Sequence, residues 1–211
     1  MELLLLLGIL TTAYAMLTAK RMSALIANFR LQSLLLFIMT FMEALAHGSF
    51  NLYLVAALIL ALKVFLIPLA LFRMLKRLKV DEHVGFFINP LLSLAISLGL
   101  TYLAWVFVRQ LFPDSAIGFV LAAAISFAVM QVGAMIMVAR IKAVTQIIGL
   151  MVIENGIFLL ASTVTGGLSL VVEMAVFLDV FISVIILGVF VYRINELFTG
   201  IDVDQLKGLR G

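Results

Sequence analysis

Three charged residues stand near the middle of long apolar runs in this sequence, where a charge is rare. They are Lys63, Glu154 and Asp179. An ionised side chain at the centre of a bilayer costs roughly 2.5 to 3.5 kcal/mol on insertion scales, so these residues must face a helix bundle or a partner subunit. Unless paired, such buried groups favour their neutral forms, which suits side chains that take up and release protons. We therefore expect a proton path that uses all three.

Two further acids, Glu43 and Glu173, lie nearer one end of their apolar runs, and we add them to the expected proton path. Glu43 is close to His47 and a loop. Solvation at the membrane surface would explain Glu43, and Glu173 in the same way, without any transport role. Gln131, also inside an apolar run, is more often an interhelical hydrogen-bond donor than a transport ligand.

Pro68 follows Lys63 by five residues and disturbs the helix beside it. Because proline has no N–H, the carbonyl of Val64 loses its helical donor. We expect a polar kink or a water molecule next to the lysine. A structural explanation is also open for Lys63, since it could form a buried ion pair with Asp179 that simply holds two helices together.

The composition requires a membrane to position these residues. Of the 211 residues, 65% are hydrophobic and only 12% are charged, and the mean hydropathy is +1.30. A soluble domain has roughly a quarter charged residues. Runs of about 17 to 25 apolar residues are long enough to cross the bilayer as helices. We predict an all-α integral membrane protein with seven such helices, approximately Leu3–Ala19, Leu31–Phe50, Leu52–Phe72, Phe86–Val108, Ser115–Val138, Val144–Thr165 and Leu168–Val191.

The loop charges predict the orientation. With seven spans, nearly all lysines and arginines fall on one side, and the other side carries little beyond Arg109. The cation-rich side is expected to be cytoplasmic. This places the protein in the inner (cytoplasmic) membrane with its N-terminus outside and its C-terminus in the cytoplasm. The first run resembles a signal peptide in its apolar part, but its cations follow it, so we expect a retained helix.

The chain forms one transmembrane domain, 1–211, within which a repeat is suggested. Leu62 to Leu66 matches Leu178 to Ile182 at an offset of 116, and Gln32 resembles Gln146 at nearly the same spacing. The first repeat would cover 1–75 and the second 115–193, with 86–108 as a linker helix and 194–211 as a cytoplasmic tail. The two repeats would have the same orientation in the membrane.

Several functions are disfavoured by the sequence. The net charge of +3 is not gathered into a patch, so no nucleic acid partner is expected. Without cysteine the chain has no thiolate ligands for a metal or an iron–sulfur cluster. His47 and His83 fall on opposite sides of the predicted membrane and cannot form one haem axial pair. We expect no catalytic residue, cofactor or metal in this chain.

Particular segments resemble known membrane subunits. The segment Gly149 to Gly156, with Glu154, Asn155 and Gly156 at its end, the segment Leu178 to Phe181, and the ending from Ile201 to Gly211 resemble subunit K of respiratory complex I. The chain is more similar to hydrogenase-4 component E, over nearly its whole length, including Lys63 to Pro68 and Lys207-Gly208. One departure is that the first acid of subunit K would align with Met151, three residues before Glu154.

This resemblance implies a non-catalytic, membrane-arm subunit of a group 4 nickel–iron hydrogenase or a formate hydrogenlyase-like complex. Its partners would be antiporter-like and other membrane-arm subunits, together with the lipid bilayer. Glu154 and Asp179 would correspond to the two membrane acids of subunit K, within the path along which protons or sodium ions are moved. A stand-alone or antiporter-associated ion transporter and a structural membrane scaffold are the alternatives.

Overall fold

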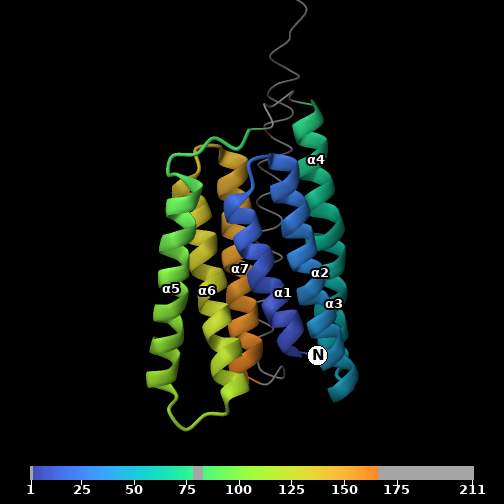
Figure 1. Cartoon of the computed structure of the whole chain (residues 1–211). Coiled ribbons are helices and arrows are strands. Elements are labelled where there is room, and N and C mark those ends of the chain that lie inside the picture. Colours follow the sequence, from blue (N-terminus) through green and yellow to red (C-terminus); the bar gives the residue numbers. More distant parts are fainter. Residues whose placement is uncertain (1, 78–82, 166–211) are drawn as a thin grey trace, which may run out of the picture.

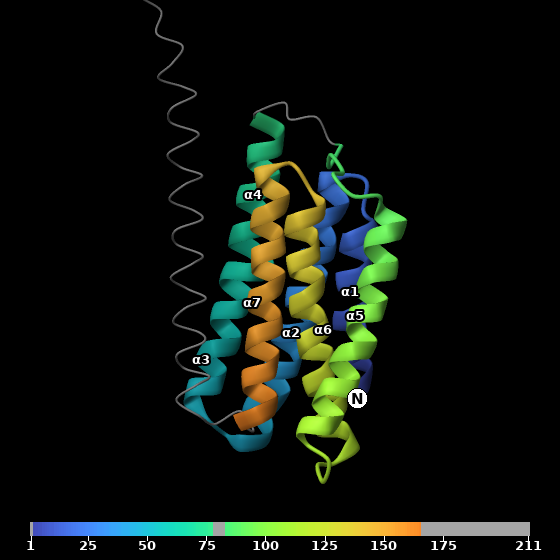
Figure 2. The ribbon, with the colours of Figure 1, turned by 90° about the vertical axis from the view of Figure 1, so that its left-hand side faces the viewer.

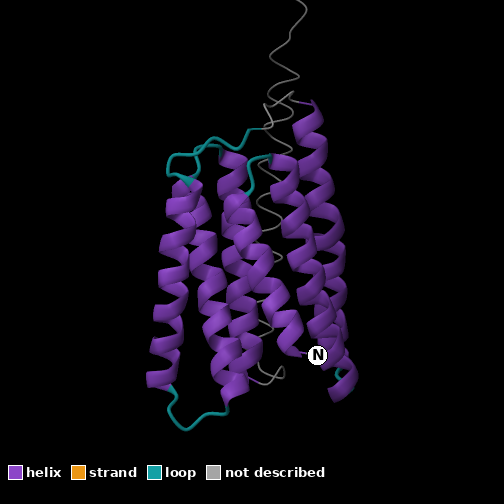
Figure 3. Cartoon of the chain, in the orientation of Figure 1, coloured by secondary structure: helices purple, strands orange, loops and turns teal. Residues whose placement is uncertain are grey.

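The computed structural model of the chain describes residues 2–77 and 83–165, which form a bundle of long helices (Figure 1). Helix α1 covers Glu2–Thr18 and α2 covers Met22–His47. The third rod is continuous and consists of α3 (Phe50–Leu58), the π-helix η1 (Ile59–Leu66) and α4 (Ile67–Arg77). The bundle is completed by α5 (Pro90–Leu111), α6 (Ile117–Ala139) and α7 (Ala143–Thr165). The described residues contain no β-strand (Figure 3).

The helices have the length and composition of membrane spans. Five of them, Met22–His47, Phe50–Lys76, Pro90–Leu111, Ile117–Ala139 and Val144–Thr165, are long and apolar enough to cross a bilayer, and Glu2–Thr18 is apolar but shorter. The protein is therefore an all-helical, multi-pass membrane protein. Each expected run up to Thr165 corresponds to one of these rods. The seventh run, Leu168–Val191, lies outside the described residues.

The predicted start of the second helix was wrong. Helix α2 begins at Met22 and not at Leu31, because Leu25, Ile26 and Phe29 continue its buried face and are fully enclosed by the bundle. As a result Arg30 lies inside a helix and not in a loop. Helix α2 ends at His47, where Gly48 adopts a left-handed conformation with φ of 61° and its N–H donates to the carbonyl of Ala44 at 2.9 Å.

The fourth predicted helix also begins later than expected. Helix α5 starts at Pro90, whose missing N–H is tolerated in a first helical turn. The side chain of Asn89 caps this end by accepting a hydrogen bond from the backbone N–H of Leu91 at 2.9 Å. Phe86, the predicted first residue, instead forms an isolated antiparallel bridge with Arg140 in the loop before α7.

Helices α6 and α7 form a close antiparallel pair at the centre of the bundle (Figure 2). Glycines allow the close approach. A Cβ atom added to Gly133 would lie 2.7 Å from the carbonyl oxygen of Gly149, and one added to Gly156 would lie 2.9 Å from that of Ser126. Small residues permit such contacts between membrane helices. Because α1 packs on α6, and α2 packs on α7, the interior of the bundle is built around this pair.

Candidate functional site: a buried polar network at mid-bundle

Lys63 lies within a π-helical segment near the middle of the third rod. In η1 the hydrogen bonds reach back five residues, as in the bond from the backbone N–H of Ile67 to the carbonyl of Leu62. The wide turns stand directly before Pro68, which has no N–H to continue an α-helical pattern. The sequence predicted a disturbed helix beside Lys63, and the structure shows it as a π-helix, a feature found frequently at functional sites.

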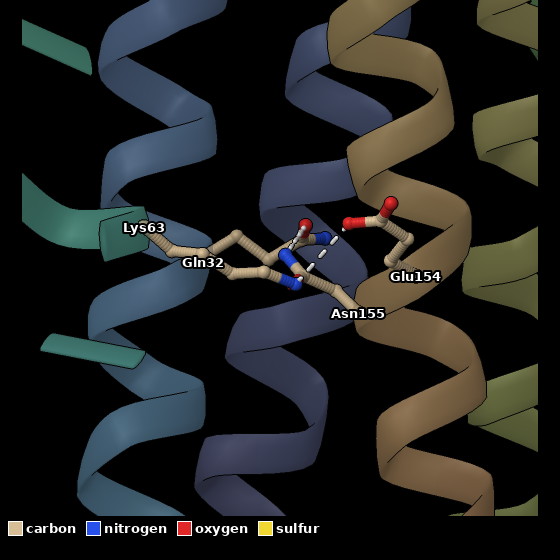
Figure 4. A network of polar contacts seen from close by, with 4 residues as sticks. All are labelled: Gln32, Lys63, Glu154 and Asn155. Atoms are coloured by element: carbon tan, nitrogen blue, oxygen red, sulfur yellow. Dashed lines mark hydrogen bonds and ion pairs between the residues drawn. The ribbon is translucent and has the colours of Figure 1, made fainter. Parts of the chain in front are cut away.

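Lys63 is enclosed by the bundle and contacts two neighbouring residues of α7 (Figure 4). Its Nζ donates a hydrogen bond to Oδ1 of Asn155 at 2.8 Å. The same nitrogen lies 3.7 Å from Oε2 of Glu154. Lys63 is 1% exposed and Glu154 is 6% exposed, so a cation and a carboxylate share a site from which lipid is excluded. The structure thus brings together two of the three mid-run charges that the sequence singled out.

The amide of Asn155 extends this site toward α2 and α1. Its Nδ2 donates to Oε1 of Gln32 at 3.0 Å, and Nε2 of Gln32 donates to the backbone carbonyl of Ile9 at 3.1 Å. Both amides are buried. Because Lys63 can only donate, Asn155 must present its oxygen to the lysine, and this choice fixes the direction of each following bond. The network therefore joins η1, α7, α2 and α1 in one sequence of hydrogen bonds.

This arrangement couples the charge of Lys63 to that of Glu154. At 3.7 Å the separation of Nζ and Oε2 exceeds the length of an ordinary N–H···O hydrogen bond, so their interaction is mainly the attraction of opposite charges. Such an attraction is stronger in a dry interior than in water. Protonation of Glu154 would remove it while leaving the hydrogen bond between Lys63 and Asn155 in place. Binding or release of a proton at Glu154 would therefore change the electrostatic energy of the Lys63 ammonium without breaking its hydrogen bond.

Glu43 lies outside this network, near the end of the bundle where α2 and α7 finish. Its side chain is partly buried, and Oε2 accepts a hydrogen bond from the hydroxyl of Ser162 at 2.9 Å. A groove of about 440 Å³ beside this pair is lined by Glu2, Glu43, Ser162, Thr163 and apolar residues of α1, α2 and α6. Glu43 is thus bonded to α7 and also borders a groove.

Apolar side chains separate Glu43 from the central network. Along α2 the fully buried Leu36 stands between Gln32 and Glu43, followed by Thr40, whose hydroxyl donates to the Leu36 carbonyl at 2.9 Å. Along α7 Phe158 and Leu159 stand between Asn155 and Ser162. The two polar sites therefore occupy different depths, as the sequence predicted for Lys63 and Glu43. Asp179 and Glu173 lie outside the described residues, so the pairing of Lys63 with Asp179 stays a prediction.

Sequence reasoning did not predict that Gln32 and Asn155 join Lys63 in this network. Gln32 was compared with Gln146 as a repeat equivalent, but the two differ in position. Gln32 is fully buried at the level of Asn155, whereas Gln146 lies in the first turn of α7, and its Nε2 is 3.5 Å from the carbonyl of Arg140. The signal that could have identified Gln32 is its depth once α2 is known to begin at Met22. Gln131 is partly buried on α6 and does not join the described network.

Arg140 forms a second buried polar centre at the end of the bundle where α1 finishes. Its two terminal nitrogens donate to the carbonyls of Met16, Leu17 and Ala19 at 2.7, 2.8 and 2.9 Å. These carbonyls lie at the C-terminal end of α1, where helical donors are missing and a cation is favoured. The guanidinium also lies 4.7 Å from the ring centroid of Phe86. Burial lowers the pKa of Arg140 to about 10, so this residue stays charged at neutral pH.

No group of three or more metal-binding side chains occurs among the residues that the structure describes. Comparison with known proteins finds that the chain is similar to the uncharacterized protein Rv0085 of Mycobacterium tuberculosis (strain ATCC 25618 / H37Rv). The two are 33% identical over 156 residues, which cover 72% of this chain and 70% of the mycobacterial protein. No protein-family model matches the chain, and no solved structure matches it.

Proposed function

The chain belongs to the family of the mycobacterial protein Rv0085, and we propose that it is a membrane-arm subunit of a group 4 nickel–iron hydrogenase or a formate hydrogenlyase-like complex. In this role it contributes protonatable side chains to the movement of protons, or sodium ions, that is coupled to redox chemistry. The redox centres belong to other subunits, and the membrane-arm partners include antiporter-like subunits. The resemblance of Gly149 to Gly156 to subunit K of complex I supports this assignment.

The observation that carries the proposal is the enclosed contact between Lys63 and Glu154 at 3.7 Å. A purely structural scaffold could use a hydrophobic pair of similar volume at this place, often with no loss of stability. Ionisable residues inside a membrane bundle are a mark of ion pathways for this reason. The π-helix around Lys63 adds a second feature that is common at functional sites.

We also propose the finer topology. The chain crosses the cytoplasmic membrane seven times, with 168–191 as the seventh span, the N-terminus outside and the C-terminus in the cytoplasm. Residues 1–75 and 115–193 form two parallel repeats. The cations near the ends of the described helices support this orientation. They gather where α1, α4 and α6 end, as Lys20, Arg21, Lys76, Arg77, Arg140 and Lys142, whereas Arg109 lies at the other end of the bundle (Figure 1).

The first test is purification of the chain from its native membrane in a mild detergent. We expect it to copurify with a nickel–iron hydrogenase or a related oxidoreductase in a fixed stoichiometry. A chain that purifies alone, or only with antiporter-like proteins, and moves ions when reconstituted would support a transporter instead and overturn the proposed complex.

The second test is Glu154→Gln in the complex. Glutamine preserves the size of the side chain and one acceptor, so assembly should persist with a stability change of about 1 kcal/mol or less. Glutamine cannot take up a proton. We expect hydrogenase turnover with artificial electron carriers to stay close to wild type, while ion pumping in sealed vesicles falls strongly.

Asp114→Asn is the matched control, because Asp114 is exposed in the connection between α5 and α6, and this variant should pump normally. Full pumping by Glu154→Gln would exclude a proton-relay role for Glu154. Loss of the whole complex in that variant would instead support a structural role for the carboxylate.

A further inference from the structure

Arg30 is an exposed cation inside the membrane-spanning part of α2. It lies eight residues after Met22, so its backbone is about 12 Å along the axis from the start of the helix. It also precedes Gln32 by two residues, or about 3 Å of helix rise. Gln32 belongs to the network that contains Lys63 and Asn155. Arg30 is therefore close to the depth of the buried ionic site, yet its side chain is exposed.

The guanidinium of Arg30 does not extend to the end of the helix. Its Cζ lies 5.6 Å from the ring centroid of Phe65, and Phe65 follows Lys63 by only two residues in η1. The charge is therefore held near the level of Lys63. A long basic side chain near a helix end can extend to the membrane surface, but this contact holds Arg30 on the side of η1.

This face of the bundle points away from the network. Lys63 is 1% exposed, whereas Phe65 is 54% exposed, so the two side chains leave η1 in opposite directions. Arg30 and Gln32 differ in the same way on α2, where Gln32 is fully buried. Leu31 and Leu66, the next residue along each helix, are 46% and 43% exposed. Arg30, Leu31, Phe65 and Leu66 thus form one outward-facing surface, which we term the Arg30 face.

Contact with lipid alone would be energetically unfavourable for the Arg30 face. A cation–π contact at an exposed site contributes roughly 0.5 to 1 kcal/mol. An arginine at the centre of a membrane helix costs roughly 2.5 to 3.5 kcal/mol on insertion scales and more in simulations. The ring of Phe65 therefore offsets only part of the cost. A carboxylate opposite the guanidinium would offset the remaining cost of placing the Arg30 charge in the membrane. The apolar side chains beside Arg30 would then contact the rest of the helix that carries this carboxylate.

We propose that the Arg30 face is an interface for a transmembrane helix of a partner subunit, which brings an aspartate or glutamate against Arg30 at the depth of Lys63. That this partner is a subunit of the same complex rests on the proposed function. Helix α7 contacts the Lys63 side of η1 through Asn155, so the Arg30 face lies on the side of η1 that points away from α7.

The absence of cysteine from the chain allows a direct test. Phe65→Cys is labelled with a photoreactive benzophenone maleimide and irradiated in the purified complex, and the adduct is identified by mass spectrometry. Tyr102→Cys is the matched control, because Tyr102 is 67% exposed near the middle of α5, and the first basic residue of that helix is Arg109, seven positions later. We expect Phe65→Cys to give an adduct within a transmembrane segment of another subunit that contains an acidic residue.

Charge exchange then tests the proposed ion pair. Arg30→Glu alone should lower the amount of bound partner by on the order of tenfold or more, because one buried charge is left facing another of the same sign. Replacing the acidic residue of the adduct segment by arginine should restore binding in the double variant. An adduct with residues 168–191 of the same chain, adducts with lipid alone, or a double variant that is not rescued would each overturn the proposal.

The two proposals fail in different ways. If the rescued partner belongs to a complex without an oxidoreductase, the Arg30 interface stands and the proposed hydrogenase role is wrong. If the hydrogenase copurifies but Phe65→Cys reaches only lipid, the proposed role stands and the interface is wrong.

Discussion

Lys63 lies closer to a neutral amide than to the carboxylate beside it, at 2.8 Å from Asn155 and 3.7 Å from Glu154. The amide supplies a hydrogen bond that does not depend on the protonation of Glu154. The lysine can thus keep one bonded partner while the charge of the other changes. This division of roles suits a relay, in which the position of the cation is held while its electrostatic environment varies.

The positions of Asn155 and Gln32 in the network predict which substitution lowers stability more. Asn155→Leu removes the acceptor for the Lys63 ammonium and the donor for Gln32, so we expect a loss of about 2 to 3 kcal/mol in the free energy of unfolding. Gln32→Leu removes only the acceptor for Asn155 and one of the donors to Ile9, whose carbonyl keeps its bond from the Thr12 hydroxyl at 2.8 Å. We expect a smaller loss, about 1 kcal/mol.

Thermal unfolding in one detergent measures this order. Gln110→Leu is the matched control, because Gln110 is exposed near the end of α5, and its unfolding temperature should stay near wild type. If Gln32→Leu were as damaging as Asn155→Leu, the Lys63 hydrogen bond would not be the main contribution of Asn155.

Sequence reasoning found the charges of this site but not its amides. Lys63 and Glu154 stand out because an ionised group in an apolar run has a large energetic cost. An asparagine or glutamine costs less, and several polar amides occur in the chain without any sign of which ones meet. Arg140 was assigned only to the cation-rich side, since a count of loop charges cannot show that a guanidinium turns inward to cap α1.

At the scale of elements, the glycines of α6 and α7 determine how closely these two helices pack. Gly133 meets the backbone of Gly149 and Ile153, while Gly156, next to Asn155, meets Met130 and Ser126. Gly149 and Gly156 are seven residues apart on α7, and Ser126 and Gly133 are seven apart on α6. This shared spacing keeps the small residues in register along the antiparallel pair. It therefore positions Glu154 and Asn155 toward η1 and α2.

Gly133→Ala should destabilise the protein. The new Cβ would lie 2.7 Å from the carbonyl oxygen of Gly149 and 2.8 Å from the backbone nitrogen of Ile153, so the helices must separate. We expect a loss of about 1 to 3 kcal/mol in the free energy of unfolding, as for other overpacked positions. Gly99→Ala in α5 is the matched control, since its Cβ would meet no atom within 4 Å. Equal stability of both variants would show that close α6–α7 packing is unimportant.

The lengths of the elements were more predictable than their ends. The bilayer sets the length of a span, so a run of apolar residues predicts a helix well. The start of α2 depends on packing instead, because Met22, Leu25 and Ile26 are buried against other helices and not against lipid alone. In the sequence, only Pro68 indicated a disturbed helix at the place where the π-helix forms. The structure gives its extent as Ile59–Leu66, whose first residue lies nine positions before Pro68.

At the scale of the whole molecule, the two ends of the bundle differ in construction. Where α1 and α6 finish, bridges between Arg21 and His83 and between Phe86 and Arg140 tie three connecting segments together. Arg140 adds three hydrogen bonds to α1 and keeps its charge at neutral pH, because its pKa of about 10 lies well above 7. The other end carries the groove beside Glu43. The tied end is also the cation-rich end.

This asymmetry predicts which end faces the cytoplasm. Cytoplasmic loops carry an excess of lysine and arginine, so the end with Lys20, Arg21 and Arg140 should face inward. Because the chain has no native cysteine, single cysteines can report the side of each loop. We expect Ser49→Cys and Ser115→Cys, in the connections α2–α3 and α5–α6, to react with a membrane-impermeant maleimide in intact cells. Lys76→Cys, at the end of α4, should react only after the membrane is opened.

A cysteine in the tail extends this test to the proposed number of spans. With a seventh span over 168–191, Leu209→Cys should behave like Lys76→Cys and stay protected in intact cells. Labelling of Leu209→Cys together with Ser49→Cys would mean that the chain does not cross the membrane after α7, and the proposal of seven spans would be wrong. Labelling of Lys76→Cys but not Ser49→Cys in intact cells would reverse the whole orientation. It would then place the groove beside Glu43 on the cytoplasmic side.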